Sequence, residues 1–350
     1  MITIVIASYN HAHYLPIMLA SIFRQGPIVS SIIVVNDAST DDTANVLAKI
    51  KINEPRLMVK NLTKNVGWLQ AQHIGLSYVE TDFFAFNAAD DFVMPGWAEQ
   101  SLNALRSAPD IGMCLSPTFV INEKSKVVTK AVFPKKLRGA VLQPMDFHRS
   151  VMRYGSWMDS NGMLIRRSAY DERSVEFSPA GAFADGVIMY VLGLKSGAVL
   201  LDEPLTVFFE RETSVSGVTV APRVSTIHLQ GLSNLLKTTP CVELVDSRLA
   251  FKILRRNTYM YLIEAANELT SKFSQIAERT LPPIASRALQ LSLLLLFNLY
   301  RLSGFVCLRP FDFMIYREST SHKATLDETQ AIGEYRKVLN DTLPSIGLDI

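Results

Sequence analysis

Two adjacent acids, Asp90 and Asp91, follow an apolar run that begins at Phe83. Neighbouring carboxylates repel each other, so the pair is unfavourable unless a cation or hydrogen-bond donors lie between them. The simplest interpretation is a solvated turn ahead of Pro95 and Gly96, because Asp is common in turns. The alternative is a binding site for a cation, and the elements around the two acids have to decide between these interpretations.

Alternating strand and helix patterns fill the first ninety residues. Apolar runs at 2–8, 31–37 and 82–88 predict buried strands, and 56–62 predicts a further short strand. The patterns over 14–25, 39–50 and 65–79 predict helices between them, with Ser39 or Thr40 as a cap of the second. This βαβ order predicts a mostly parallel sheet, whose ligands bind beyond the carboxyl ends of the strands. Polar residues fall at three such ends, which favours a shared binding crevice: Ser8, Tyr9, Asn10, Asp37, Asp90 and Asp91.

The chain of 350 residues is long for one core, so we expect two domains or one domain with an appendage. Short β-like pieces follow residue 111, then a helix-like segment over 183–197 and one strand over 198–210. From about Val218 long helical runs take over. We therefore predict one domain over 1–217, with halves of about 1–110 and 111–217, and a mostly helical region over 218–350.

Composition excludes several classes of protein. A net charge of +2 gives no reason to expect a nucleic-acid partner. The three cysteines lie far apart, which fits neither a disulfide framework nor a metal site and suits a reducing cytosol. The first residues already form a strand pattern without a secretory signal, so we expect a cytoplasmic protein.

Five motifs together resemble the family 2 glycosyltransferases of GT-A fold. They are "IASYN", "VVNDASTDD", "NVGWLQAQHIG", "AADDFVMPGW" and "FADGVIMYVLGLKSG", and the resemblance covers roughly residues 1–215. It implies an α/β nucleotide-binding half joined to an acceptor-binding half. It also implies inverting transfer of a sugar from a nucleotide-diphosphate donor, usually with Mg²⁺ or Mn²⁺.

The resemblance assigns the donor site residue by residue. Tyr9, between Ser8 and Asn10, corresponds to the aromatic that stacks on the uracil ring. Asp37 corresponds to the acid that accepts the nucleobase N3–H, which suits UDP- or dTDP-sugars because the N3 of uracil and thymine is a donor. Asp91 corresponds to the metal ligand and Asp90 to the acid nearer the ribose.

Inverting transfer needs a base that takes the proton of the acceptor hydroxyl. The resemblance assigns this role to Asp185, and a helix N-terminal acid is the alternative interpretation. His73 and His148 are alternatives on chemistry alone, but His73 lies in an apparent helix and fits a packed or solvated histidine better. Arg211 either pairs with a phosphate or is solvated.

Trp157 and Asp159 fall where family members line the acceptor pocket, although Trp157 fits core packing equally well. The expected activity is transfer to a hydroxyl of a glycan or lipid-linked acceptor, as in polysaccharide biosynthesis at the cell envelope. The alternative is a GT-A-like protein that binds a nucleotide-sugar without transferring it. This alternative arises because Ala88 and Ala184 stand where the family commonly has acids.

The run 288–308 is long enough to cross a bilayer and contains one charge, Arg301. Spanning would hold Arg301 in hydrocarbon at a cost of roughly 2.5–3.5 kcal/mol. Packing within the helical appendage or a homodimer avoids this cost, as does contact with the inner surface of the cell membrane. We expect one of these two arrangements.

Overall fold

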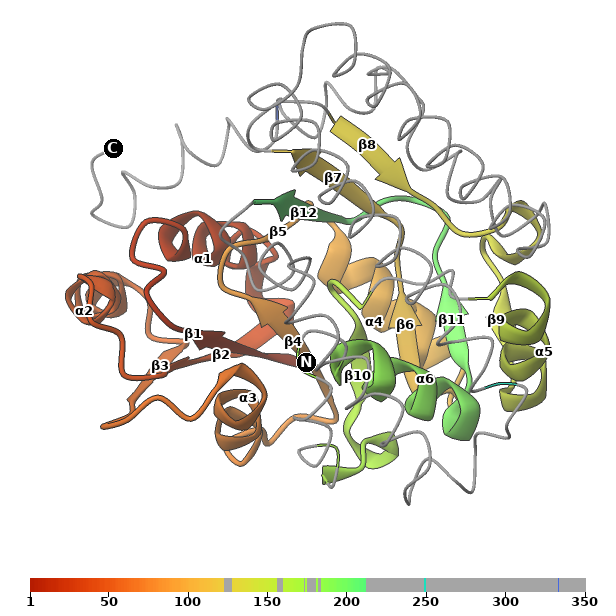
Figure 1. Ribbon diagram of the computed structural model, residues 1–350, viewed down its shortest axis with the longest axis horizontal. Coiled ribbons are helices and arrows are strands. Elements are labelled where there is room, and N and C mark those ends of the chain that lie inside the picture. The colour runs from red at the N-terminus through yellow and green to blue at the C-terminus, as the bar shows by residue number, and fades with distance from the viewer. Residues whose placement is uncertain are drawn as a thin grey trace, which may run out of the picture.

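A computed structural model of the chain describes residues 1–122, 128–155, 160–172, 174, 181, 184–211, 249 and 333 (Figure 1). All structural findings concern these residues. The predicted helical region 218–350, with its apolar run 288–308, lies outside them apart from positions 249 and 333, and so do Trp157 and Asp159.

The first part of the chain forms the predicted βαβ units. Strand β1 pairs in parallel with β2 on one side and β4 on the other, and β2 pairs in parallel with β3. Each of the predicted strands and helices in this part is confirmed within a few residues. The strands are β1 (Ile2–Ser8), β2 (Val29–Asn36), β3 (Leu57–Asn61) and β4 (Phe83–Ala88), and the helices are α1 (Leu15–Phe23), α2 (Thr43–Asn53) and α3 (Trp68–Leu76).

The same sheet continues into the second half of the predicted domain. Its eight strands have the order β3-β2-β1-β4-β10-β6-β11-β9, in which β10 pairs antiparallel with both β4 and β6. The mixed α/β architecture with a mostly parallel N-terminal part is therefore confirmed. The added strands are β6 (Met113–Leu115), β9 (Val141–Leu142), β10 (Leu164–Arg166) and β11 (Ala198–Leu200).

A second sheet of four strands lies beside the first, in the order β5-β12-β7-β8 (Figure 1). Its strands are β5 (Phe92–Val93), β7 (Thr118–Asn122), β8 (Val128–Ala131) and β12 (Thr206–Glu210). The prediction of one strand over 198–210 is wrong, because that stretch divides into β11 and β12. The exposed acids Asp202 and Glu203, followed by Pro204 without an N–H, end the first ladder, and the chain passes to the other sheet.

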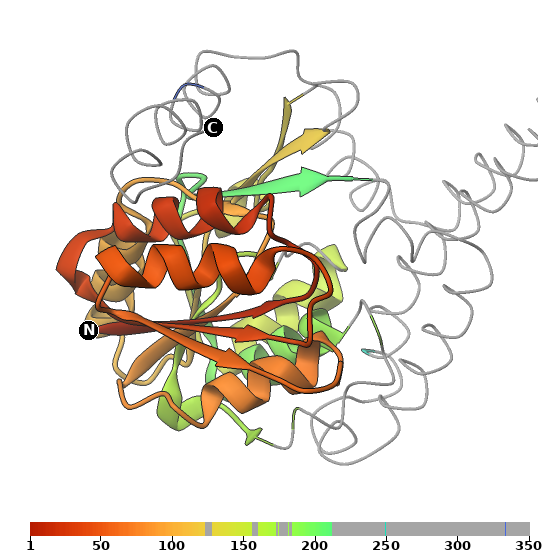
Figure 2. The same ribbon diagram turned by 90° about the vertical axis from the view of Figure 1, so that its left-hand side faces the viewer.

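Helices cover both faces of the large sheet (Figure 2). Helices α1 and α2 contribute to the core on one face together with α4 (Trp97–Ser107), and α3 packs on the other face. Helices α5 (Pro144–Tyr154) and α6 (Ala184–Ser196) cover the second half of the sheet. Short 3-10 helices occur at Gly26–Ile28, Lys135–Leu137 and Arg167–Ala169.

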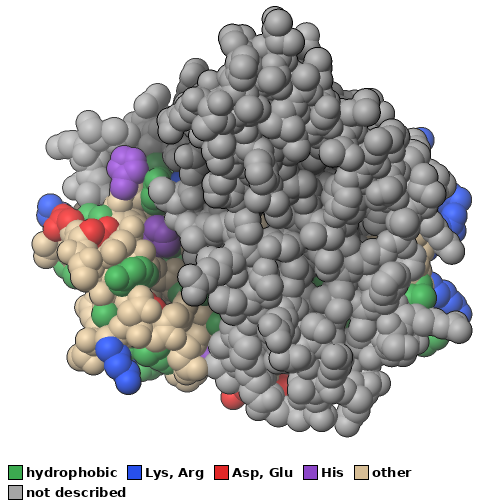
Figure 3. All heavy atoms as spheres, viewed as in Figure 1, with side chains coloured by type: hydrophobic (Ala, Val, Ile, Leu, Met, Phe, Trp, Pro, Cys, Tyr) green, Lys and Arg blue, Asp and Glu red, His purple; other side chains and the backbone are tan. Residues whose placement is uncertain are grey.

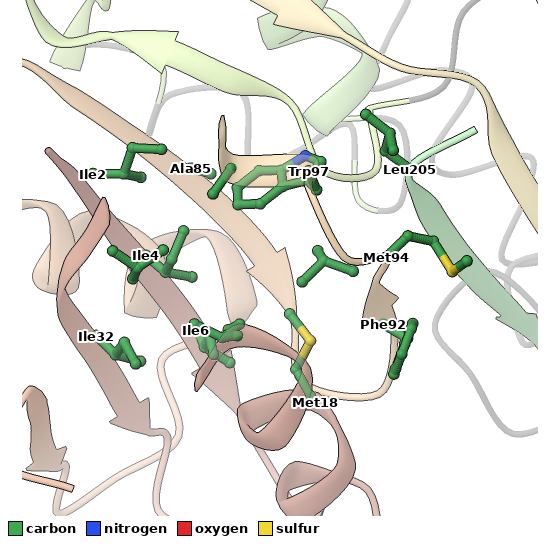
Figure 4. Close-up of a cluster of buried hydrophobic side chains, with 14 of the residues drawn as sticks. Ile2, Ile4, Ile6, Met18, Ile32, Ala85, Phe92, Met94, Trp97 and Leu205 are labelled. Atoms are coloured by element: carbon green, nitrogen blue, oxygen red, sulfur yellow. The ribbon is translucent and has the colours of Figure 1, made fainter. Parts of the chain in front are cut away.

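The core on the face covered by α1, α2 and α4 is built from alternate residues of β1. Ile2, Ile4 and Ile6 are fully buried and meet Met18 of α1 and Trp97 of α4 (Figure 4). This alternation continues to Ser8 at the end of the strand, where the apolar side chains give way to polar ones. The rigid core thus reaches to the edge at which the candidate residues lie.

Candidate active site

The loops that follow β1 and β2 are bonded to each other. Asn10 adopts a left-handed φ of 57°, a conformation that Asn tolerates well. Its Oδ1 accepts the Thr40 N–H at 2.8 Å, and its own N–H donates to Ser39 Oγ at 2.9 Å. The prediction that Ser39 or Thr40 caps α2 is therefore wrong, because both residues bond to Asn10 instead. The helix begins at Thr43, whose N–H donates to Asp41 Oδ1 at 3.0 Å.

Asp37 joins these loops to the turn before α3. Its carboxylate oxygens accept the N–H groups of Val66 at 2.7 Å and Gly67 at 2.9 Å, and its own N–H donates to the Ser8 carbonyl at 2.8 Å. The side chain is only 2% exposed. Each carboxylate oxygen still has a second lone pair for a nucleobase N–H. Asp37 thus shapes the nucleotide-side loops whatever it contacts in a ligand.

Tyr9 and Ser8 lie side by side at the end of β1 but face different surroundings. Tyr9 is 43% exposed, so a ligand could reach part of it. Ser8 is buried, and its Oγ has no hydrogen-bond partner among the described residues. In the space-filling view, acidic and histidine side chains lie at the surface of this N-terminal part (Figure 3).

The two adjacent acids point to different partners. Asp91 is buried, and its Oδ1 accepts the Phe209 N–H of β12 at 3.2 Å. Asp90 forms an ion pair with Arg211, whose Nη1 lies 2.9 Å from Asp90 Oδ2 and 3.1 Å from the Asp90 carbonyl oxygen. The repulsion between the acids is therefore relieved by one backbone N–H and one guanidinium.

Arg211 is enclosed rather than solvated, so the solvated interpretation is wrong. Its side chain is 5% exposed. The guanidinium carbon lies 4.1 Å from the ring centroid of Tyr14 and 4.8 Å from that of Phe209, within the range of cation–π contact. The α1 entrance and β12 thus fix the cation beside Asp90.

His11 is a neighbour of this ion pair that the sequence reasoning missed. Burial lowers the pKa of its imidazole; Asp90 acts in the opposite direction, and Arg211 lowers it further. Its Nδ1 is buried and has no hydrogen-bond partner among the described residues. The available signal was its position one residue after the "SYN" of the strand end.

The acids fit a divalent cation only in part. Among the described residues, no group of three or more His, Cys, Asp or Glu side chains is placed to hold a metal ion. Mg²⁺ is often bound through one or two carboxylates together with substrate phosphates. Asp91, with Asp90 beside it, suits that arrangement. These residues therefore fit a cation that arrives with, or is completed by, a diphosphate.

Asp185 lies in the first turn of α6. Its Oδ2 accepts the Ser160 hydroxyl at 2.5 Å, and its Oδ1 accepts the Gly186 N–H at 2.7 Å. Burial raises the pKa of Asp185 above its ordinary value, and the bonds from Ser160 and Gly186 offset part of this rise. The bond to Gly186 is a helix-terminus contact, while a raised pKa is what a carboxylate base requires.

The segment 160–162 connects Asp185 to the strand that carries Arg211. Gly162 has φ +66°, and a Cβ there would lie 2.2 Å from Thr206 Cγ2 of β12. Its carbonyl accepts the Trp97 indole N–H at 2.9 Å. These contacts place Ser160 near the first residue of β12, and the Ser160 hydroxyl in turn donates to Asp185.

Two candidate histidines are placed away from this chemistry. His73 Nδ1 lies 3.0 Å from the Leu69 carbonyl and its Nε2 lies 3.1 Å from the Tyr170 hydroxyl, so it is a packed histidine, as expected. His148 lies on α5, on the half of the sheet that α5 and α6 cover. The positions of Trp157 and Asp159 are outside the described residues.

The match to a known family decides what kind of domain this is. The sequence model of the family described as Glycosyl transferase family 2 matches residues 3–172. Residues 3–172 are a family 2 glycosyltransferase domain. The predicted resemblance is confirmed over the span that contains Asp37, Asp90 and Asp91.

Several relatives are glycosyltransferases that share part of the chain. An uncharacterized glycosyltransferase of Haemophilus influenzae is 25% identical over 188 residues, or 53% of this chain and 57% of the relative. The uncharacterized glycosyltransferase YwdF of Bacillus subtilis is 30% identical over 171 residues, or 49% of this chain and 60% of the relative. The chain spans about half the length of the curated relatives it matches.

A solved structure shows the same fold. Residues 1–349 of TarS from S. aureus have a TM-score of 0.52 and 15% identity, with 93% of this chain and 94% of that one covered. The same TarS fragment was also crystallised with UDP-GlcNAc, and that structure has a TM-score of 0.50 and 16% identity, with 93% of this chain and 95% of that one covered. The similarity confirms the predicted GT-A architecture.

Across the described part of the chain, no helix combines the length and the apolar character needed to cross a membrane.

Proposed function

We propose that this glycosyltransferase moves a sugar from a UDP- or dTDP-sugar to a hydroxyl of a glycan or lipid-linked acceptor, with inversion at the anomeric carbon. The observation that carries the proposal is that two carboxylates with unlike surroundings are each linked to β12 or to the residue that follows it. Asp90 forms an ion pair with Arg211, directly after β12, and the half-buried Asp185 accepts a hydrogen bond from Ser160 of the 160–162 segment, in which Gly162 packs against Thr206 of β12.

Donor binding is assigned to the loops at the carboxyl edge of the sheet. Tyr9 offers its exposed ring to the nucleobase, and Asp37 offers carboxylate lone pairs to an N3–H. Asp91, with Asp90 beside it, would hold a divalent cation, Mn²⁺ or Mg²⁺, together with the diphosphate. When bound, such a cation stabilises the negative charge that develops on the leaving diphosphate.

Proton transfer is assigned to Asp185. The acceptor hydroxyl attacks the anomeric carbon from the face opposite the diphosphate, and its proton passes to a carboxylate oxygen of Asp185. The raised pKa makes this carboxylate a stronger base than an ordinary Asp. Ser160 orients the carboxylate by donating to Oδ2.

A panel of UDP- and dTDP-sugars, each offered with glycan and lipid-linked acceptors, tests the proposal by the release of nucleotide. UDP-GlcNAc belongs in the panel because TarS was crystallised with it. A teichoic acid poly(glycerol phosphate) polymerase of Staphylococcus epidermidis, 35% identical over 91 residues covering 13% of that protein, suggests wall-polymer acceptors. We expect acceptor-dependent release of UDP or dTDP.

The competing function is nucleotide-sugar binding without transfer, for which Ala88 and Ala184 are the sequence argument. Tight binding of UDP without transfer to any acceptor would favour it. Release of nucleotide that depends on both the acceptor and Asp185 would exclude it.

A further inference from the structure

Arg211 occupies the position at which a cation would meet Asp90. Its Nη1 contacts both the Oδ2 and the carbonyl oxygen of Asp90, and the guanidinium is enclosed between Tyr14 and Phe209. The two side chains of the pair are only 5% and 18% exposed. The pair is therefore largely shielded from water. A charge-assisted hydrogen bond is stronger in such surroundings than in water.

This pairing changes what the two acids present to a metal ion. With Arg211 in place, the negative charge of Asp90 is already balanced by a guanidinium, so Asp90 attracts a divalent cation less strongly than it would without this partner. The adjacent Asp91 is buried and accepts the Phe209 N–H. Electrostatic attraction for a divalent cation is correspondingly weakened before a ligand arrives.

We propose that Arg211 is the built-in counter-cation of Asp90, so that a divalent cation gains this carboxylate only after the diphosphate of the donor has engaged the guanidinium. The inference rests on the proposed function for the identity of that ligand. It assigns an order to the site: nucleotide first, cation second.

The chemistry of a nucleoside diphosphate suits this exchange. A guanidinium has five N–H donors in a planar fork that matches phosphate oxygens as well as carboxylates. His11, whose Nδ1 has no partner among the described residues, lies within electrostatic range of both members of the pair. A diphosphate at this position therefore meets Arg211 and His11 together, and the charge of Asp90 becomes available to the metal.

Binding of Mn²⁺ alone, followed by electron paramagnetic resonance of the free ion, tests the ion pair directly. In the wild type we expect weak binding. Arg211→Gln leaves Asp90 uncompensated and should tighten Mn²⁺ binding at least about tenfold. Unchanged or weaker binding by a folded Arg211→Gln protein would overturn the proposal.

Arg56→Gln is the matched control. Arg56 also forms a mostly buried ion pair, with Glu54 at 2.7 Å and side chains 24% and 11% exposed. Its loss leaves a carboxylate that has no second acid next to it in sequence. We expect Mn²⁺ affinity within about twofold of the wild type, and an equal tightening in both variants would show that any orphaned carboxylate produces the effect.

Asp90→Asn keeps the test decisive should Arg211→Gln fail to fold. If Arg211 already neutralises Asp90, this substitution should change the affinity for Mn²⁺ alone by less than about threefold. A loss of all Mn²⁺ binding would show that Asp90 is an open metal ligand and would overturn the proposal.

A final arm adds saturating UDP. We expect UDP to tighten Mn²⁺ binding at least about tenfold in the wild type and clearly less in Arg211→Gln, where Asp90 is already available. Equal tightening in both proteins would contradict the exchange. Absence of UDP binding in the wild type would contradict the proposed function, and the measurements with Mn²⁺ alone would still decide the ion pair.

Discussion

Two acids of the candidate site, Asp90 and Asp185, have unlike surroundings. Asp90 contacts a guanidinium, so its negative charge is matched by a positive one. Asp185 is bonded by a hydroxyl and a backbone N–H, both neutral, and burial raises its pKa. The same side chain thus suits ion pairing in one place and, by our proposal, proton transfer in the other. The neighbouring residues decide the role.

Two regions of the site also differ in how they are built. At the ends of β1 and β2, Asp37, Asn10 and Ser39 bond loops from different strands to one another. At the start of α6, Asp185 is bonded within its own helix and to Ser160. A substitution at the ends of β1 and β2 therefore disturbs several loops, whereas one at Asp185 acts on a single group.

The largest expected effect is at Asp185. Asp185→Asn keeps the size of the side chain but removes the base, so transfer should fall by roughly 10²–10⁴-fold. UDP binding, measured by calorimetry with Mn²⁺, should stay within about threefold. Asp146→Asn, also in the first turn of a helix, is the control and should be near neutral. Normal transfer by Asp185→Asn would reduce Asp185 to a helix-terminus acid.

A smaller loss is expected at the metal acid. Asp91→Asn can still accept the Phe209 N–H but loses its charge, so activity should fall by on the order of 10²-fold with little change in melting temperature. Steady-state transfer and a thermal melt measure the two effects. Near-normal wild-type activity in EDTA would show that the acids do not serve a metal.

The pH dependence of kcat/KM sharpens the comparison further. Transfer needs Asp185 ionised, so activity should fall as pH drops through a pKa above that of an ordinary Asp. Because the Ser160 hydroxyl bond lowers that pKa, Ser160→Ala should move the acid limb to higher pH. If the acid limb of Ser160→Ala stays at the pH of the wild type, the limb reports the ionisation of a group other than Asp185.

The pKa of Asp185 should also make the stability of the folded protein depend on pH. A folded-state pKa above the unfolded one makes the ionised Asp185 destabilising above that pKa, and this penalty disappears as pH falls through it. Asp185→Asn should therefore raise the melting temperature at neutral pH and raise it less in acid. A gain that is the same at both pH values would argue against burial as the cause.

The smallest expected effect concerns backbone strain at Ala38, in the loop after β2. Ala38 has φ +57°, which costs a non-glycine residue about 1 kcal/mol. Ala38→Gly should stabilise the protein by about 0.5–1 kcal/mol in denaturant unfolding. Ala48→Gly, in the exposed middle of α2, should instead destabilise it by about 0.5–1 kcal/mol. Two changes of the same sign would remove the argument for strain at Ala38.

The sequence was most informative for segments whose local apolar pattern matches their burial in the fold. The apolar runs ending at Ser8, Asp37 and Asp90 predicted the parallel sheet and its carboxyl edge, because a central strand shows its burial in every residue. The spacing of Phe147, Val151 and Tyr154 could also have revealed α5, which sequence reasoning passed over.

Other parts could not be predicted because they depend on distant strands. The ion pair of Arg211 with Asp90 requires β12 to lie beside β5, a pairing that no local pattern records. The bond from Ser160 to Asp185 requires the 160–162 segment to pack on Trp97 and Thr206. The roles assigned to Tyr9, Asp37, Asp91 and Asp185 remain predictions.

The continuous eight-stranded sheet restricts how this chain can be recombined with related ones. Dividing the chain near residue 110 would remove β10 and expose the hydrogen-bonding edge of β4. An exposed edge of this kind promotes aggregation. It would also remove Arg166, whose guanidinium binds the carbonyls of Leu105 and Ala108 at the end of α4. The proposed donor and acceptor halves therefore cannot be exchanged as separate units, and we expect that specificity can be changed only by replacing individual loops.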